Sequence, residues 1–271
     1  MKQKRGIFFG IILSVVFVGM FSACQRKRHA DYDAMMAASS RLEIKTKDGG
    51  GYCTATAFEK NGDIYRFITA AHCVAKYNEA TQETILKEAT YKVVLEEKDG
   101  NKISYDAKVR MVGELKNSED VAVVEAKIDK LIPLISIADS DPKLGEDVAI
   151  VTAPTFLGNE LVKGYISKKK FNNNLIVSGV NWRGFALMQK VGLGNGQGSS
   201  GGSIVSEERN AIIATVVGFI RTWQDHISLT VLPISKFKKF YNEAKQGKRV
   251  LIREAQNKCQ VSLDDLLKNL K

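Results

Sequence analysis

The chain alternates short apolar, β-branched runs with polar turns, and this pattern predicts a protein built from strands. In the first half, six such runs are rich in Val, Ile, Thr and Tyr, and turn signals such as Asn61-Gly62-Asp63 separate them. Strands are predicted over residues 42–46, 51–58, 64–69, 91–97, 103–112 and 121–126. Six strands of this length suit a small antiparallel barrel.

A second series of strand-like runs follows a predicted crossover over residues 127–143. The runs cover residues 147–152, 161–167, 175–180, 186–191, 203–206, 212–220 and 227–232. That is one more than a second six-stranded barrel needs, so we expect at least one of these predictions to be wrong. After them, Phe237, Tyr241 and Ala244 recur at helical spacing over residues 235–246, and Gly247 ends this predicted closing helix.

The last 24 residues, 248–271, form a tail outside this pattern. A further helix is predicted from Ser262, with acidic residues in its first turn and lysines near its end, an arrangement that suits the helix macrodipole. The sequence of the tail does not indicate a function for it.

The N-terminus has the layout of a secretory signal. Residues 1–5 are basic, residues 6–21 are apolar, and the small residues Ser22 and Ala23 precede Cys24. This layout also resembles the box that the lipoprotein signal peptidase recognises, although Phe21 stands where that box usually has Leu. We therefore expect residues 1–23 to be a signal peptide and Cys24 to carry lipid. An ordinary cleaved signal and an uncleaved anchor of about 18 apolar residues are the alternatives.

Residues 24–40 are polar and charged with few apolar positions, and they are predicted to be a tether between a membrane and the folded domain. Basic residues at 26–28 supplement a single lipid chain by attraction to an anionic membrane surface. The expected location is therefore extracytoplasmic and membrane-anchored. An uncleaved anchor has basic residues on both flanks, so its orientation is only weakly specified.

Composition narrows the class of protein. Apolar residues make up 44% of the 271 positions, which is ordinary for a globular protein with a full core and excludes disorder of the whole chain. The formal net charge of +10 favours contact with anionic surfaces. Because the basic residues are scattered and no module that reads bases is present, we expect no nucleic-acid partner.

Three stretches carry candidate chemistry. Gly-Gln-Gly-Ser-Ser-Gly-Gly-Ser over residues 196–203 places Ser200 among residues with almost no side chains, where a substrate carbonyl can approach the backbone closely. His72 ends an apolar strand, and Asp120 precedes another. A serine hydroxyl needs a base and a group that orients the base, so these stretches offer a nucleophile, a base and an acid.

The order of these stretches resembles the catalytic blocks of the chymotrypsin-like serine peptidases. Thr-Ala-Ala-His-Cys, Asp-Val-Ala-Val-Val and Gly-Ser-Ser-Gly-Gly follow one another as in that family, nearer to its bacterial members than to digestive trypsins, and the similarity spans residues 42–239. It implies an all-β fold of two six-stranded antiparallel barrels with a C-terminal helix. The expected domain covers residues 41–247, with barrel 1 at about 41–127 and barrel 2 at about 144–234.

The resemblance also implies a function. We expect a serine endopeptidase of the bacterial envelope, a periplasmic or cell-surface lipoprotein. It is expected to cleave peptide bonds in envelope or extracellular proteins or peptides through a His72–Asp120–Ser200 triad and an acyl-enzyme on Ser200, without metal or cofactor. The N–H groups of Gly198 and Ser200 are the expected oxyanion hole. Gly194 falls at the base of the specificity pocket, and Arg221 and Trp223 fall on one wall. Because trypsin has a carboxylate at the position of Gly194, no preference for basic side chains is expected.

Cys53 and Cys73 form the disulfide that the resemblance implies, since Cys73 follows the histidine and Cys53 stands where its usual partner does. Acylation of Cys24 leaves the same pair in an oxidising compartment, with Cys259 as a free thiol or an intermolecular link. A bridge between Cys24 and Cys259 stays open if lipidation does not occur. The loop of about 20 residues that the Cys53–Cys73 bridge closes corresponds to roughly 3 kcal/mol.

Asp147 competes with Asp120 for the role of the acid, because Glu-Asp-Val-Ala-Val-Val at 119–124 returns as Glu-Asp-Val-Ala-Ile-Val at 146–151. Asp120 is preferred, because a whole second set of strands then separates it from Ser200, as in the family. Asp147 is then a surface residue.

Two departures from the family's pattern leave a second function open. Ser199 replaces the Asp that pairs with a newly cut N-terminus in digestive relatives, and Ser203 replaces the usual Pro. The first departure predicts that this form of zymogen activation is not used. Together they allow a catalytically silent, protease-fold lipoprotein that acts as a binding module.

Overall fold

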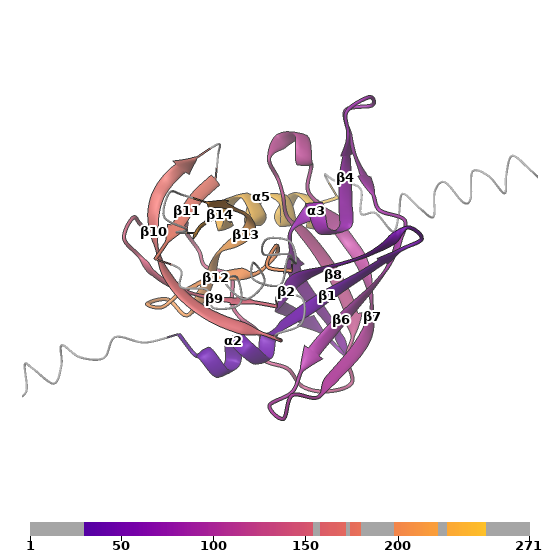
Figure 1. The fold of residues 1–271 in the computed structure, drawn as a ribbon, viewed down its shortest axis with the longest axis horizontal. Helices are drawn as coiled ribbons and strands as arrows, with labels where there is room; N and C mark the ends of the chain where they lie inside the picture. Colours follow the sequence, from indigo (N-terminus) through magenta and orange to yellow (C-terminus); the bar gives the residue numbers. More distant parts are fainter. Residues whose placement is uncertain (1–29, 154–157, 172–173, 180–197, 222–226, 248–271) are drawn as a thin grey trace, which may run out of the picture.

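The computed structural model describes residues 30–153, 158–171, 174–179, 198–221 and 227–247. Within these residues the chain forms two closed barrels of six antiparallel strands each. Figure 1 shows them side by side, the first in indigo to magenta and the second in salmon to orange. The fold class predicted from the sequence, two six-stranded barrels with a C-terminal helix, is confirmed.

Barrel 1 closes in the order β1-β2-β3-β8-β7-β6. Its strands are β1 (Ser39–Thr46), β2 (Gly49–Asn61), β3 (Ile64–Thr69), β6 (Ala89–Glu96), β7 (Lys102–Val112) and β8 (Ala122–Lys127). All six strands predicted for the first half are confirmed. Between β3 and β6 lie one helical turn, α3 (Ala71–Val74), and a hairpin of β4 (Ala75–Asn78) and β5 (Glu83–Leu86). These short elements escaped prediction because they contain too few apolar residues to set a period.

Barrel 2 closes in the order β10-β11-β14-β13-β12-β9. Its strands are β9 (Asp147–Thr152), β10 (Glu160–Phe171), β11 (Asn174–Ser178), β12 (Ser203–Ser206), β13 (Ala211–Arg221) and β14 (Ile227–Pro233). They match six of the seven predicted runs. The seventh, 186–191, lies outside the described residues, and the barrel closes without it.

The sequence repeated at residues 119–124 and 146–151 has a physical explanation in the two strands that begin there. Four consecutive residues at the start of β8, Val121–Val124, and four within β9, Val148–Val151, are at most 1% exposed; Val121 directly precedes β8. A strand that is buried on both faces needs apolar side chains at every position instead of at alternate ones. The same demand therefore produces the same Val-Ala-Val/Ile-Val run twice.

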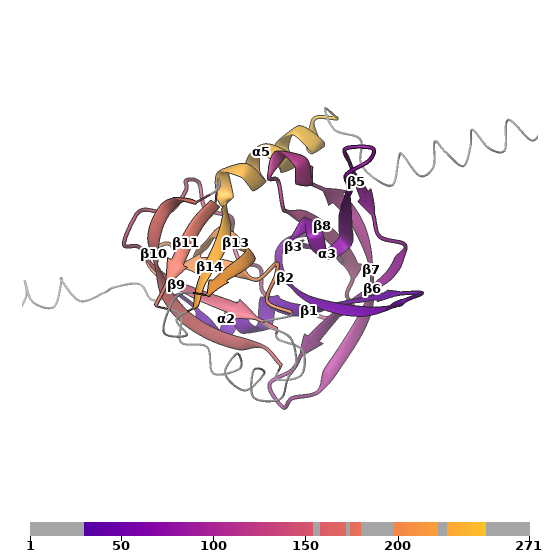
Figure 2. The ribbon, with the colours of Figure 1, turned by 45° about the horizontal axis from the view of Figure 1, so that its top comes forward.

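The closing helix α5 (Ile234–Lys245) joins the two barrels, as Figure 2 shows. It follows β14 of barrel 2, yet its buried aromatic face lies on β2 of barrel 1. The centroid of the Phe58 ring lies 5.4 Å from that of Phe237 and 5.5 Å from that of Tyr241, and both contacts are edge to face. The Tyr241 hydroxyl donates to Glu59 at 2.7 Å. This predicted helix is confirmed, and it holds one barrel against the other.

The N-terminal end of the described chain corrects the prediction of a tether over residues 24–40. Helix α2 (Tyr32–Ala38) is capped by Asp31, buries Met35 and Ala38, and runs directly into β1. The Tyr32 hydroxyl donates to Glu207 of barrel 2 at 2.8 Å. Seven residues with two buried positions make too short a pattern to be read as a helix, but they suffice for docking. Residues 30–40 are therefore part of the folded domain, and a tether over residues 24–29 stays a prediction.

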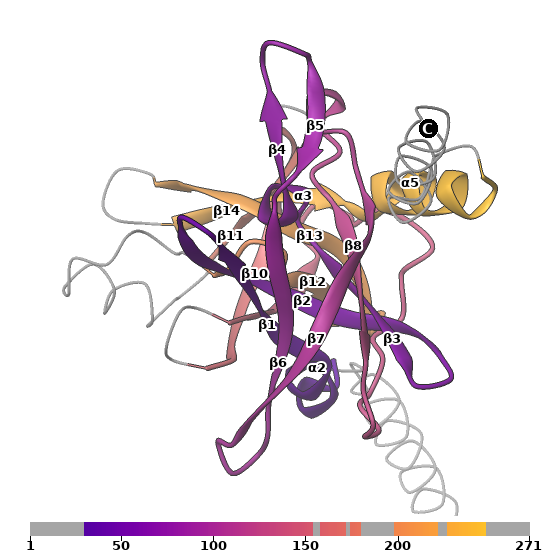
Figure 3. The ribbon, with the colours of Figure 1, turned by 90° about the vertical axis from the view of Figure 1, so that its right-hand side faces the viewer.

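In Figure 3 α2 lies near the bottom of the strands, and the α3 turn lies higher, beneath the β4–β5 hairpin. None of the helices within the described residues has the length and apolar character that crossing a membrane requires.

Candidate active site

His72 lies on α3, the helical turn that follows β3. Its backbone N–H donates to Oδ1 of Asp120 at 2.8 Å, and its Nδ1 lies 2.7 Å from Oδ2 of the same carboxylate. Because an ionised carboxylate only accepts hydrogen bonds, Nδ1 carries the proton, and Nε2 of a neutral ring is left as an acceptor. Asp120 therefore sets both the orientation and the tautomer of the imidazole.

Asp120 reaches His72 from a tight loop between β7 and β8. The Gly113 N–H donates to the carbonyl of Val121 at 2.8 Å, and a Cβ on Gly113 would come within 2.2 Å of the carbonyl oxygen of Glu119. This close approach turns the chain so that Asp120 faces α3. Asp147, the competing residue, is exposed at the start of β9. Asp120, and not Asp147, is therefore the carboxylate that hydrogen-bonds to His72.

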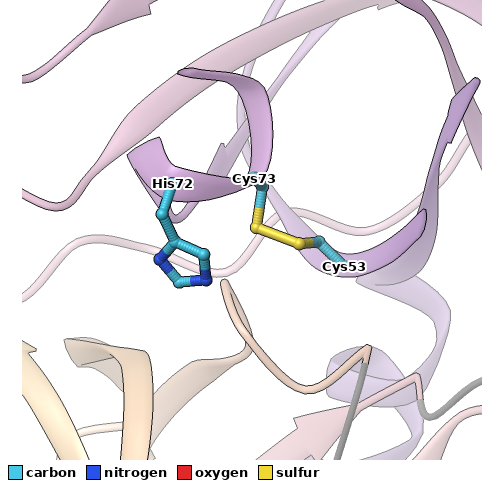
Figure 4. A group of neighbouring side chains, drawn as sticks. All are labelled: Cys53, His72 and Cys73. Atoms are coloured by element: carbon cyan, nitrogen blue, oxygen red, sulfur yellow. A yellow bond between two sulfur atoms is a disulfide. The ribbon is translucent and has the colours of Figure 1, made fainter. Parts of the chain in front are cut away.

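The predicted disulfide between Cys53 and Cys73 is confirmed, and it ties β2 to α3. Figure 4 shows it beside the imidazole. Both sulfur atoms and a ring nitrogen of His72 lie within 4.8 Å of one another. Because the sulfur atoms are bonded to each other, this cluster presents no thiolates to a metal ion.

Ser200 lies against the same disulfide. Its carbonyl oxygen is 4.0 Å from Sγ of Cys73 and accepts the N–H of Thr54 at 2.8 Å. In Figure 4 the pale orange segment before β12 passes close to the imidazole of His72. The structure thus gathers the three predicted residues at one place, His72 and Asp120 from barrel 1 and Ser200 from the turn before β12.

The turn that carries Ser200 requires glycine. Gly198 and Gly201 have φ of +105° and +86°, which favour a residue without a Cβ. A Cβ on Gly201 would also lie 2.2 Å from the carbonyl oxygen of Thr54. The N–H of Gly201 donates to Val216 and that of Gly202 to Ser199, whereas no hydrogen bond within the described residues uses the N–H of Gly198 or Ser200. These two N–H groups are the ones predicted to bind an oxyanion.

Thr54 is a site residue that sequence reasoning missed. Its hydroxyl donates to the carbonyl of Gly198 at 2.6 Å and accepts the N–H of Ala153 at 2.8 Å. Its own carbonyl accepts the hydroxyl of Thr69 at 2.7 Å. Thr54 therefore connects barrel 1 to the Ser200 turn and to the end of β9. The contact with Gly198 joins residues 144 positions apart, so the sequence around Thr54 does not indicate it. The adjacent Cys53 is the only local feature that points to this part of the strand.

Ser199 is 4% exposed, and Ser203 is 2% exposed. Neither hydroxyl has a hydrogen-bond partner within the part of the chain that is described. Ser199 thus puts a neutral buried group where digestive relatives have a carboxylate, and a neutral group requires no buried cation.

The specificity pocket stays a prediction from the sequence. Gly194 and Trp223 lie outside the described residues, and Arg221 is described only as the last residue of β13. Cys24 and Cys259 also lie outside the described residues.

Two antiparallel barrels, with a His–Asp pair on one and a glycine-rich serine turn entering the other, define the architecture of the chymotrypsin-like serine peptidases. Residues 53–214 match the trypsin-like peptidase domain, and the chain belongs to this family.

The serine endoprotease from Yersinia pestis has a similar structure, with a TM-score of 0.56 at 17% sequence identity. The similarity covers 82% of this chain and 69% of that chain, and at this identity it shows the fold alone. A search of curated proteins found no match.

Proposed function

We propose that the protein is a serine endopeptidase in which Ser200 is the nucleophile, His72 the general base and Asp120 the acid that orients it. The observation that carries the proposal is the double hydrogen bond between His72 and Asp120, made beside a glycine-rich turn that bears Ser200. A hydrogen-bonded carboxylate and imidazole next to a serine form the arrangement that turns a hydroxyl into a nucleophile.

The first half of the reaction forms the acyl-enzyme. Oγ of Ser200 attacks the carbonyl carbon of the scissile peptide bond and passes its proton to Nε2 of His72. Asp120 stabilises the imidazolium that results. The tetrahedral oxyanion accepts hydrogen bonds from the N–H groups of Gly198 and Ser200. Its collapse breaks the peptide bond, and His72 gives its proton to the departing amine.

The second half of the reaction hydrolyses the acyl-enzyme and releases the carboxylic acid product. Water attacks the ester on Ser200 while His72 removes its proton, and the second tetrahedral intermediate occupies the same oxyanion site. Its collapse returns the proton to Ser200. The proposed chemistry uses groups of this chain and water alone.

The substrates that this site suits are proteins or peptides. Gly194 supplies no carboxylate to select basic side chains, so cleavage after Lys or Arg is not expected to dominate. A cleavage profile on a proteome-derived peptide library, with Ser200→Ala as the control, measures this preference directly.

The protein's place in the cell is part of the proposal. Lipidation of Cys24 after signal removal puts the domain outside the cytoplasm on a membrane. The test is the mass of the N-terminal peptide together with fractionation of cells that make the wild type or Cys24→Ala. A diacylated Cys24 in the membrane fraction, lost in the variant, supports the proposal. An intact Met1 or an unmodified N-terminus contradicts it.

The second candidate function is a protease-fold binding module, which Ser199 and Ser203 favour because neither buried hydroxyl has a hydrogen-bond partner among the described residues. Turnover of the peptide library distinguishes the two candidates. Wild-type hydrolysis that disappears in Ser200→Ala supports the peptidase. Binding of peptides by both proteins, with hydrolysis by neither, supports the module.

A further inference from the structure

The helical turn that carries His72 depends on partners outside itself. An α-helix leaves its last four carbonyl groups without intrahelical partners, and α3 is only four residues long. The Ala71 carbonyl accepts the N–H of Ala75, at the C-cap. The other three carbonyl groups of the turn all bond to one residue that lies outside the helix.

That residue is Lys87. Its Nζ donates to the carbonyl of His72 at 2.7 Å and to that of Cys73 at 3.1 Å, and its backbone N–H donates to the carbonyl of Val74 at 2.9 Å. A cation at a helix C-terminus also interacts favourably with the helix dipole. Lys87 thus caps the whole C-terminal side of the turn.

The lysine is itself held in place. The hydroxyl of Tyr91 lies 3.0 Å from the carbonyl oxygen of Lys87 and 3.2 Å from that of Val74, so it bridges the two. Burial lowers the pKa of the Lys87 ammonium, whereas the negative charge of Asp120 raises it in part. The Lys87 ammonium is partly buried and bonded to two carbonyl groups, so its position is fixed. An exposed lysine side chain, by contrast, samples many rotamers.

We propose that Lys87 is a positioning residue for the catalytic histidine, a role that rests on the proposed peptidase activity. Both backbone polar groups of His72 are then hydrogen-bonded: its N–H donates to Asp120, and its carbonyl accepts from Lys87. Loss of the lysine releases the carbonyl side, so the turn and its imidazole shift relative to Ser200. Misplacement of a catalytic group by about 1 Å can cost about 100-fold in rate, so we expect a loss of about 10- to 100-fold in kcat. KM is unchanged, because Lys87 is not expected to contact substrate.

The test compares three variants of the full chain. Lys87→Met keeps the length of the stem but has no donor, Lys87→Arg keeps the cation and its donors, and Lys76→Met removes an exposed lysine of β4. The measurements are kcat, KM and the low-field proton NMR resonance of the ring N–H between His72 and Asp120. If Lys87→Met does not fold, Lys87→Gln, which is uncharged and one bond shorter, takes its place with the same expected loss.

We expect Lys87→Met to lose about 10- to 100-fold in kcat at constant KM and to lose or broaden the resonance. Lys87→Arg is expected to recover most of both, and Lys76→Met to match the wild type. A folded Lys87→Met with wild-type kcat and resonance overturns the proposal, as does an equal loss in Lys76→Met. The resonance requires no turnover, so a silent wild type refutes the peptidase while the role of Lys87 at the turn is still measured.

Discussion

The backbone N–H of Thr54 donates to the carbonyl of Ser200 at 2.8 Å, so a strand of barrel 1 holds the turn that carries Ser200 at the entrance to barrel 2. The Thr54 hydroxyl adds a second link, to Gly198. The turn is therefore positioned by the barrel that also carries His72 and Asp120. Relative movement of the barrels is restricted where the three residues meet.

Thr54→Val removes this hydroxyl without changing the shape of the side chain. The carbonyl of Gly198 and the N–H of Ala153 lose a buried partner, so we expect a loss of about 1–3 kcal/mol in the free energy of unfolding. We also expect kcat to fall by about tenfold or more, because the oxyanion donors shift. Urea unfolding and steady-state kinetics measure the two effects. Thr54→Ser keeps the hydroxyl and is the control; equal behaviour of the Val and Ser variants contradicts this role.

Gly201→Ala tests the close approach of the turn to barrel 1. The new Cβ would meet the Thr54 carbonyl at 2.2 Å and the Thr69 hydroxyl at 2.3 Å, so the turn must move. We expect activity to be lost and the unfolding temperature to fall. Gly62→Ala has a similar positive φ but nothing within 4 Å of the new Cβ, and it should cost only about 1–2 kcal/mol. An active Gly201→Ala enzyme would show that the turn is not confined in this way.

Asp120→Asn keeps the size of the side chain but removes its negative charge and replaces one of its two acceptor oxygens with an NH2 donor. Because the remaining oxygen can accept the N–H of His72, the NH2 group then faces Nδ1 and favours the wrong imidazole tautomer. Loss of the equivalent carboxylate in this type of triad lowers kcat by about 10⁴, and we expect a similar loss here. Asp147→Asn is the matched control, because it changes the same residue in the repeated sequence. Comparable losses in the two variants would refute the assignment of the acid.

Glu146 should make folding sensitive to acid. Burial of Glu146 raises its pKa, but hydrogen bonds from Ser206, the N–H of Lys143 and Arg209 outweigh burial, and the pKa lies below the ordinary 4.5. A carboxyl group with a lowered folded-state pKa stabilises the fold above its unfolded pKa. That stability is lost as the pH falls through the folded-state value.

We therefore expect wild-type stability to decline below about pH 4.5, and Glu146→Gln to lack this part of the decline. At neutral pH the variant should be less stable by about 2–4 kcal/mol, since Arg209 loses a bidentate partner. Chemical unfolding between pH 3 and 8 measures both effects. Asp139→Asn, at an exposed carboxylate, is the control. Parallel pH curves for Glu146→Gln and the wild type would contradict the prediction.

Local sequence patterns were sufficient for most strands and for the candidate triad. Strand prediction worked because barrel strands repeat a strong apolar pattern, and His72, Asp120 and Ser200 lie in short, distinctive neighbourhoods. The same patterns overlooked α2, whose seven residues show no clear amphipathic period. They also predicted a seventh strand, at 186–191, in addition to the six strands that close barrel 2; these residues lie outside the described part of the chain.

Residues that act through distant contacts could not be read from the sequence. Thr54 lies among ordinary strand residues, and nothing local indicates that its hydroxyl meets Gly198. Lys87 is one of many lysines, and its role follows only from the folding of β4 and β5 back onto α3. Such roles depend on side chains whose partners are fixed by the closed barrels, so they required the three-dimensional structure.

The account rests on Ser200 being activated by His72. The most direct measurement is the reaction of the full chain with a fluorophosphonate, followed by intact mass and peptide mapping. We expect one adduct per chain, located on Ser200 and not on Ser199 or Ser203, and no adduct in Ser200→Ala or His72→Ala. A folded wild-type protein that gains no adduct, or gains it equally without His72, would contradict the central claim.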